Sequence, residues 1–232
     1  VEMKNPFRKY VKKYVPPSEI DTITKDEFDS IIEAIDTYTP ICKLGGKGEN
    51  KNMYKPYLKD SFKLFLLSGG RREEVVDLKW NNIFVTESKI KFFRIVNLKV
   101  TRIKKKEEII KYIPINDDLF DFLKELGYDE KRNTDEYILS PERFEKSKTM
   151  MDKLSKSFTH YRIGASIEKK ISLKDLRKTY ISWVKVEMGE NTGLISSHST
   201  YGVLEKFYLD PKILTAIETA ALKVRVFGKN KP

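Results

Sequence analysis

The sequence has very few of the residues that bind metals or form disulfides. It contains one cysteine, Cys42, and two histidines among 232 residues, so an internal disulfide is excluded and a zinc site built from these residues alone is not expected. Its longest apolar runs, such as Leu64–Leu67, are far shorter than the ~20 residues of a membrane-spanning helix. The N-terminus lacks the apolar core of a signal peptide. We therefore expect a cytoplasmic protein without a membrane segment or a metal.

Cofactor-binding motifs are also missing. The sequence has no glycine-rich dinucleotide fingerprint after a strand, no phosphate loop ending in Gly-Lys-Ser/Thr and no His-Glu-x-x-His. His198 lies outside the Gly-x-Ser-x-Gly context of a serine hydrolase. We therefore expect no bound cofactor.

The sequence is instead rich in positive charge. It has 45 Lys and Arg against 34 Asp and Glu, a net charge of +11, and 40% of its residues are hydrophobic. Such a composition is typical of a folded protein rather than a disordered one. The positive charge favours a polyanionic partner, and it leaves nucleic acid, an anionic membrane surface and a merely solvated cationic surface open.

The first third of the chain is predicted to contain an arm followed by helices. Residues 1–20 are basic and include Pro16-Pro17, which blocks helix propagation, so we expect an arm or linker there. Thr24–Glu27 has the capping-box pattern of a helix start. A polar loop rich in Gly and Asn, over residues 45–52, is predicted to precede a second helix that ends at Ser68–Gly70. A further helix is predicted over Arg71–Leu78.

Between residues 83 and 115 the pattern changes from helix to strand. β-branched and aromatic residues concentrate in Ile83–Val85, Ile90–Val96 and Ile109–Ile115. The charged stretch Lys99–Glu108 separates the last two segments. These segments predict a small antiparallel sheet with a long basic hairpin tip.

The remainder of the chain is predicted to be mainly helical. A helix is expected from Asp117, another after a cap at Ser172–Asp175, and a last one over about residues 211–224. We therefore predict an α+β fold, with helices around a three-stranded antiparallel sheet, in a single domain over residues 21–232.

Two groups of cations are candidates for binding an anion. Arg71 and Arg72 follow a Gly-Gly turn, and Glu74 is placed to pair with Arg71. Lys174, Arg177 and Lys178 are spaced to project together from one helix, opposite its apolar stripe. Ordinary surface arginines and a solvated helix face explain these groups equally well at this point.

The order of these features resembles that of the tyrosine recombinase (integrase) family. Ser68–Trp80 is similar to the first arginine box of the family, and Leu173–Tyr180 is similar to its second. A basic hairpin lies between them, and Ser197-His198 and Tyr208 follow. The resemblance extends from about residue 20 to about residue 210. It departs from the family pattern at Lys174, where a histidine is usual.

The resemblance implies DNA strand cleavage and rejoining through a covalent 3′-phosphotyrosine, without metal or ATP. Tyr208 is the expected nucleophile, and Tyr201 lies too near His198 to fit. The hairpin lysine that protonates the leaving 5′ oxygen is either Lys99 or Lys106, and Lys99 is our choice. The implied catalytic residues are Arg71, Lys99, Lys174, Arg177, His198 and Tyr208. Residues expected to contact DNA are Arg72, Arg102, Lys104, Lys105, Lys106 and Lys178.

We therefore expect a site-specific recombinase of a virus or mobile element that acts on double-stranded DNA attachment sites. The resemblance implies a homotetramer on DNA and a monomer or weak dimer when free. Residues 1–20 are too few for the DNA-encircling domain of the family, so we expect either a catalytic fragment or a minimal form. The helix over about 211–224 is expected to dock on a neighbouring subunit or to pack on its own domain. A type IB topoisomerase and a non-catalytic DNA-binding domain are the alternatives.

Overall fold

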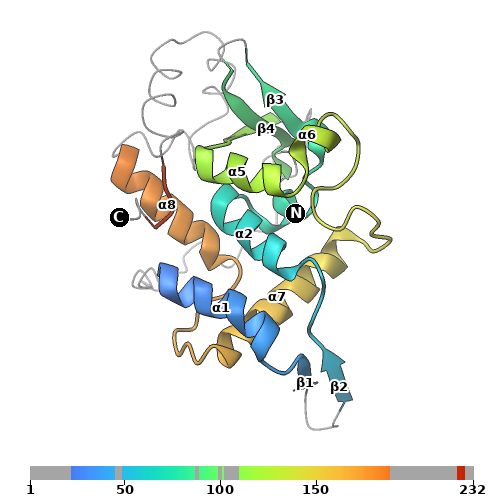
Figure 1. Cartoon of the computed structure of the whole chain (residues 1–232), viewed down its shortest axis with the longest axis vertical. Helices are drawn as coiled ribbons and strands as arrows, with labels where there is room; N and C mark the ends of the chain where they lie inside the picture. Colours follow the sequence, from blue (N-terminus) through green and yellow to red (C-terminus); the bar gives the residue numbers. More distant parts are fainter. Residues whose placement is uncertain are drawn as a thin grey trace, which may run out of the picture.

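In the computed structural model, helices surround a small antiparallel sheet, and a two-stranded hairpin projects from one end (Figure 1). The structure describes residues 22–44, 49–86, 89–98, 101, 110–188 and 224–227. The helices are α1 (Lys25–Thr37), α2 (Leu58–Ser68), α3 (Arg72–Val76), α5 (Asp117–Glu125), α6 (Tyr128–Lys131), α7 (Ser147–Gly164) and α8 (Asp175–Met188), with a 3₁₀ turn at Trp80–Asn82. The strands are β1 (Ile41–Leu44), β2 (Glu49–Asn52), β3 (Ile83–Val85), β4 (Lys91–Val96) and β5 (Ile110–Pro114).

Helix α1 begins where the sequence predicts it. The Thr24 hydroxyl accepts a hydrogen bond from the backbone N–H of Glu27, and the Glu27 carboxylate accepts one from the backbone N–H of Thr24. This capping box satisfies N–H groups that the first turn leaves without helical partners. The apolar face of α1 is buried at Phe28, Ile31 and Ile35.

The prediction of a loop over residues 45–52 is wrong in part, because β1 and β2 form an antiparallel hairpin. Lys43 pairs with Asn50, and Cys42 pairs with Lys51. The side chains of Lys43, Asn50 and Lys51 are exposed. A strand that does not bury one face lacks the alternation of apolar and polar residues that identifies strands in a sequence.

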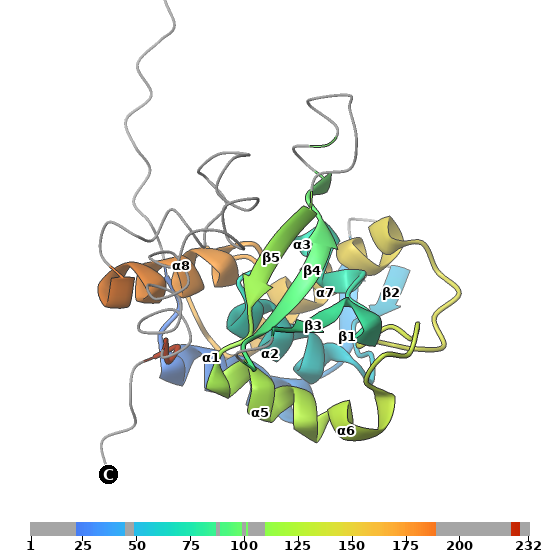
Figure 2. The same cartoon turned by 90° about the horizontal axis from the view of Figure 1, so that it is seen from above.

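The three-stranded sheet is confirmed, with strand order β3-β4-β5 and antiparallel pairing throughout. Figure 2 shows this sheet with α2 on one side and β4 and β5 extending together toward their hairpin end. In β5, Lys111 and Ile113 are buried while Ile110 and Tyr112 are partly exposed. Lys111 therefore points to the same side of the strand as the core residue Ile113, because alternate residues share a face.

Helix α2 is central to the core. It packs against α8, α3, α5 and α7, and the rings of Phe62 and Phe158 meet edge to face with centroids 5.1 Å apart. The predicted apolar stripe of the last described helix is confirmed, since Leu176, Tyr180 and Val184 are buried. No described helix combines the length and apolar composition needed to cross a membrane.

The turn between α2 and α3 requires glycine at Gly69. Its φ is +55°, a left-handed conformation that side chains disfavour. A Cβ at this position would lie 2.1 Å from Cδ1 of Tyr180, so the ring of Tyr180 occupies the space of a side chain. This contact packs the turn between α2 and α3 against α8. Helix α3 itself is shorter than the predicted Arg71–Leu78.

Residues 224–227 pack on their own domain. The Val224 carbonyl accepts a hydrogen bond from Asn116 Nδ2 at 2.9 Å, and the Phe227 ring lies 6.2 Å from that of Phe28. Arg225 forms ion pairs with Asp117 and Asp118 at the start of α5. The predicted helix over 211–224 lies outside the described residues except for Val224.

Candidate active site

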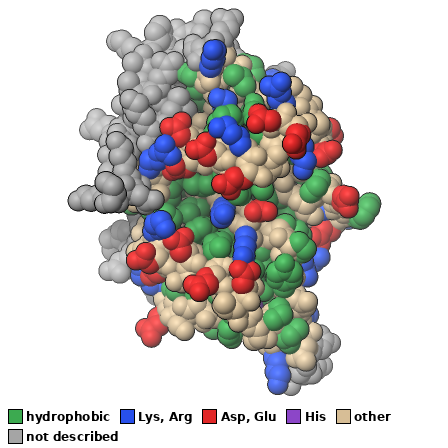
Figure 3. Space-filling model, viewed as in Figure 1, with side chains coloured by type: hydrophobic (Ala, Val, Ile, Leu, Met, Phe, Trp, Pro, Cys, Tyr) green, Lys and Arg blue, Asp and Glu red, His purple; other side chains and the backbone are tan. Residues whose placement is uncertain are grey.

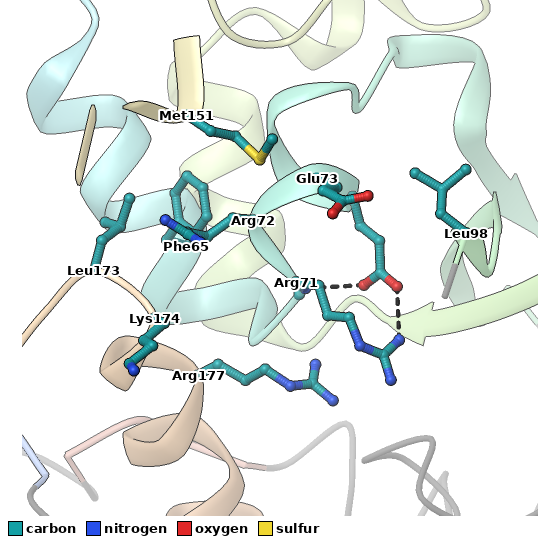
Figure 4. Close-up of a pocket in the computed structure, with 11 residues that line it drawn as sticks. Phe65, Arg71, Arg72, Glu73, Leu98, Met151, Leu173, Lys174 and Arg177 are labelled. Carbon is teal, nitrogen blue, oxygen red and sulfur yellow. Dashed lines mark hydrogen bonds and ion pairs between the residues drawn. The ribbon is translucent and has the colours of Figure 1, made fainter. Parts of the chain in front are cut away.

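A pocket of about 490 Å³ opens where the starts of α3 and α8 approach the end of β4 and the first turns of α7 (Figure 4). This volume falls in the usual range of ligand sites, about 300–1,000 Å³. Its lining combines apolar side chains with four cations and two carboxylates. The lining side chains come from Phe65, Arg71, Arg72, Glu73, Glu74, Leu98, Met151, Leu173, Lys174 and Arg177, and Gly70 completes it.

Arg71 is fixed in the pocket by Glu74. Arg71 Nη1 donates to Glu74 Oε1 at 2.9 Å, and the Arg71 backbone N–H donates to Glu74 Oε2 at 2.9 Å. Arg71 Nη1 also donates to Asn97 Oδ1 at 3.3 Å. The predicted pairing of Arg71 with Glu74 is therefore confirmed. The Arg71 side chain keeps 23% of its surface exposed, whereas Glu74 keeps 2%, so the guanidinium reaches the pocket and the carboxylate supports it from below.

Arg177 enters the same pocket from α8. Its Nη1 donates to the Gly69 carbonyl oxygen, so the turn that precedes Arg71 also orients Arg177. Figure 4 shows the guanidinium groups of Arg71 and Arg177 reaching toward the same space. Two arginines that are separated by more than a hundred residues in the sequence thus converge on one point.

A third cation, Lys111, lies near the two arginines and contacts the carboxylate that holds Arg71. Its side chain is 2% exposed, and its Nζ donates to Glu74 Oε2 at 2.9 Å. Neither Lys111 nor Asn97 is among the site residues predicted from the sequence. A signal for Lys111 was present, because a lysine two residues before Ile113 in a strand occupies an inward-facing position.

The pKa values of these groups reflect the crowding of charge. Burial lowers the pKa of Lys111 to about 8; Glu74 opposes that shift, while Arg177 and Arg71 add to it. Burial also lowers the pKa of Arg177, and the nearby charge of Arg71 lowers it further. Burial by itself raises the pKa of Glu74, but the charge of Lys111 and hydrogen bonds from Arg71 and Lys111 bring it below its usual value. Glu74 is therefore ionised among three positive groups.

The profile of the phage integrase family matches residues 21–191, which include every residue of this pocket. The chain belongs to the phage integrase family. Among solved structures, it is similar to a lambda integrase (75–356) dimer bound to a COC′ core site, with 14% identity, a TM-score of 0.51, and coverage of 82% of this chain and 63% of that one. These values establish a shared fold.

Two further structures have similar scores. A lambda integrase dimer bound to a COC′ core site has 16% identity and a TM-score of 0.50, with 86% of this chain and 51% of that one covered. A lambda integrase tetramer bound to a Holliday junction has 15% identity and a TM-score of 0.50, with 80% and 49% covered. The matched part of the chain thus spans 49% to 63% of the length of these integrases. No curated protein sequence matches it.

The two lysines that were predicted to act with Arg177 differ in their surroundings. Lys174 is exposed and lines the pocket. Lys178 forms an ion pair with Asp175 at 2.7 Å and does not line the pocket. The prediction that Lys174, Arg177 and Lys178 project together is therefore wrong in part. Lys174 and Arg177 both line the pocket, whereas Lys178 pairs with Asp175 along its own helix.

Arg72 follows Arg71 in the chain, but its hydrogen-bond partner lies on α7. It is exposed, lines the pocket and donates from Nη1 to Ser155 Oγ at 2.9 Å. The remaining predicted site residues lie outside the described part of the chain: Lys99, Arg102, Lys104, Lys105, Lys106, His198 and Tyr208. Their predicted roles stay predictions.

The surface seen in Figure 3 does not carry charge of a single sign. Acidic and basic side chains are intermingled there, and apolar side chains lie between them. Within the residues that the structure describes, no group of three or more His, Cys, Asp or Glu side chains is arranged to hold a metal ion. The cations that line the pocket are three arginines and one lysine.

Proposed function

We propose that this chain is the catalytic domain of a site-specific DNA recombinase that cleaves and rejoins strands through a 3′-phosphotyrosine. The convergence of Arg71 and Arg177 on one pocket is the observation that carries the proposal. Guanidinium groups donate in a planar fork that matches two phosphate oxygens. In a phosphoryl transfer they stabilise the charge that develops on the non-bridging oxygens, and they need no reorganisation when they are already fixed.

The remaining roles follow from the family positions in this sequence. The Tyr208 phenolate attacks phosphorus, the bond from phosphorus to the 5′ oxygen breaks, and that oxygen takes a proton from a hairpin lysine. Leu98 lines the pocket and directly precedes Lys99, which supports Lys99 rather than Lys106 as the proton donor. His198 and Lys174 position the phosphate or move protons. The reverse reaction with another 5′ hydroxyl rejoins the strand, and the phosphotyrosine conserves the energy of the broken bond.

The proposed partner is double-stranded DNA at attachment sites, in the cytoplasm of a host cell. We propose that residues 21–232 act as the catalytic domain, that residues 1–20 contact the DNA backbone as a basic arm, and that four copies assemble on two duplexes. The lambda integrase dimer and tetramer structures, which hold a core site and a Holliday junction, support this assignment. Arg72, Lys178 and the basic residues of the hairpin, Arg102, Lys104, Lys105 and Lys106, are proposed to contact phosphates without reading sequence.

The test is capture of a covalent complex. The protein is incubated with a pool of nicked duplexes of random sequence, in which the cleaved fragment diffuses away and the tyrosine adduct accumulates. We expect a denaturant-resistant protein–DNA complex that Tyr208→Phe abolishes and that the matched variant Tyr201→Phe retains. An adduct that persists in Tyr208→Phe contradicts the nucleophile assignment. If the protein relaxes supercoiled plasmid but does not exchange strands between duplexes that carry the captured sequence, it is a type IB topoisomerase instead.

A further inference from the structure

Lys111 is an unusual lysine because it is almost completely buried. Its side chain is 2% exposed on the inward face of β5, whereas lysines are almost never fully buried unless they are paired. It does not line the pocket, so it does not reach a bound phosphate in this arrangement. Its Nζ donates to the carboxylate of Glu74.

Glu74 is shared between Lys111 and Arg71. Oε2 accepts hydrogen bonds from Lys111 Nζ and from the backbone N–H of Arg71, and Oε1 accepts from the guanidinium of Arg71. The carboxylate is thus held from two sides. One side belongs to the sheet and the other to the residue that borders the pocket.

We propose that Lys111 is a positioning residue of the reaction: through Glu74 it holds the Arg71 guanidinium in place and prevents the carboxylate from neutralising it. The inference rests on the proposed function, because the anion that Arg71 would bind is the scissile phosphate. If the Glu74 carboxylate paired with Arg71 alone, it would cancel the charge of Arg71. Because the carboxylate is shared with Lys111, a surplus of positive charge remains at the pocket.

The charge balance makes this role depend on the proton of Lys111. The charged groups that face Lys111 are Glu74 from α3, Arg71 at the start of that helix and Arg177 from α8. With Lys111 protonated, three cations surround one carboxylate, and loss of its proton leaves two. Burial and the two arginines bring the pKa of Lys111 to about 8. The surplus of positive charge is therefore lost within the pH range in which the reaction is measurable.

The experiment measures the rate of covalent complex formation by Lys111→Met and Lys111→Arg with excess protein on the captured duplex, from about pH 6.5 to about pH 9.5. Near neutral pH, Lys111→Met should slow cleavage by about tenfold to a hundredfold, because a displaced Arg71 no longer meets the developing charge. Its affinity for the duplex should stay within about twofold of wild type, since Lys111 does not contact DNA phosphates. Lys111→Arg should restore the rate.

The pH profile separates positioning from a structural role. Wild-type cleavage should decline above about pH 8, and Lys111→Arg should move that decline to higher pH because arginine keeps its charge. Lys91→Met is the matched control. Lys91 is on the adjacent strand β4, lies over the ring of Phe120 from α5 and does not line the pocket. It should cleave at the wild-type rate.

The outcomes distinguish a failure of the proposed function from a failure of the role proposed for Lys111. If the wild type forms no covalent complex with any duplex, the proposed function fails and takes this inference with it. If the wild type forms the complex and Lys111→Met forms it equally fast, only the inference is overturned. It is also overturned if Lys111→Arg declines at the same pH as the wild type, a result that stays informative even if Lys111→Met does not fold.

Discussion

The two ends of helix α3 each hold an arginine beside a carboxylate, and they use it differently. At the N-terminal end, Arg71 shares Glu74 with Lys111, and its guanidinium keeps an open side toward the pocket. At the C-terminal end, Arg143 pairs with Asp77, donates to the Val76 carbonyl at 2.6 Å and lies 3.7 Å from the centroid of the Tyr137 ring.

The difference is one of charge balance and of access. The Arg143 side chain is 3% exposed, and its acceptors are all supplied by the protein. Around Glu74, by contrast, three cations surround one carboxylate, and the pocket opens on that side. A balanced pair closes a junction between elements, whereas an unbalanced cluster beside a pocket is placed to receive an anion.

The largest expected effect is on catalysis at the unbalanced end. Arg71→Ala should lower the rate of covalent complex formation by about a thousandfold, because it removes a fixed donor from the developing charge of the transition state. Single-turnover cleavage of the captured duplex measures this rate. Arg71→Lys should recover only part of it, since an ammonium lacks the planar fork. Cleavage by Arg71→Ala within tenfold of wild type would remove Arg71 from the site.

At the balanced end, the expected effect is on stability. Arg143→Ala should lower the free energy of unfolding by about 3 kcal/mol, because it leaves the Val76 carbonyl and Asp77 without their cation. Urea denaturation measures the change. The matched control is Lys25→Met, whose ion pair with Asp29 is exposed and should contribute less than about 1 kcal/mol. The rate of cleavage per folded molecule should stay unchanged in Arg143→Ala, and a selective loss of rate would contradict the contrast.

Much of this fold is predictable from local patterns. The capping box at Thr24 gives the start of α1, and β-branched and aromatic residues locate β3, β4 and β5. The hairpin β1–β2 is not predictable in this way, because its exposed strands carry no apolar alternation. Helix α3 ends early since the chain turns at Asp77 and Lys79 pairs with Tyr137, a tertiary contact that periodicity does not contain.

The candidate site also has a part that is predictable from local sequence and a part that depends on tertiary contacts. Arg71 and Glu74 are three residues apart, so their pairing follows from helix geometry and was predictable. The position of Arg177 depends on the carbonyl of Gly69, and the contact of Lys111 with Glu74 depends on the placement of β5 beneath α3. Both are long-range contacts, and spacing along one helix grouped Arg177 with Lys178 instead.

The pH dependence of stability tests the unbalanced cluster without DNA. An unfolded lysine titrates near 10.5, whereas burial lowers the pKa of Lys111 to about 8. Between these values the unfolded chain binds more protons than the folded one, so Lys111 makes the folded state more stable as pH rises. From about pH 7.5 to about pH 9.5, the wild type should therefore gain about 1 to 2 kcal/mol relative to Lys111→Met.

Urea unfolding of both proteins across this range gives the difference directly. Other titrating groups are common to the two proteins and cancel in the comparison. A relative loss of wild-type stability with rising pH would mean that the attraction of Glu74 exceeds the cost of burial. In that case Lys111 stays protonated throughout, and the cluster is more nearly balanced than its geometry indicates.

The smallest expected effect concerns Arg72, the sequence neighbour of Arg71. Arg72 is exposed and donates to Ser155 rather than to a buried carboxylate, so it has no fixed direction toward the phosphate that Arg71 and Arg177 would hold. Arg72→Ala should weaken DNA binding about equally for all sequences and reduce the salt dependence of binding by about one phosphate contact. Cleavage of bound DNA should change by less than about threefold, because that step depends on preorganised donors.

Titrations of duplex DNA at several salt concentrations measure the slope, and Lys124→Ala on α5, which does not line the pocket, is the control. If Arg72→Ala lost as much cleavage as Arg71→Ala, exposure and pairing would not separate the catalytic arginine from its neighbour. The contrast between fixed and exposed cations would then fail for Arg71 and Arg72.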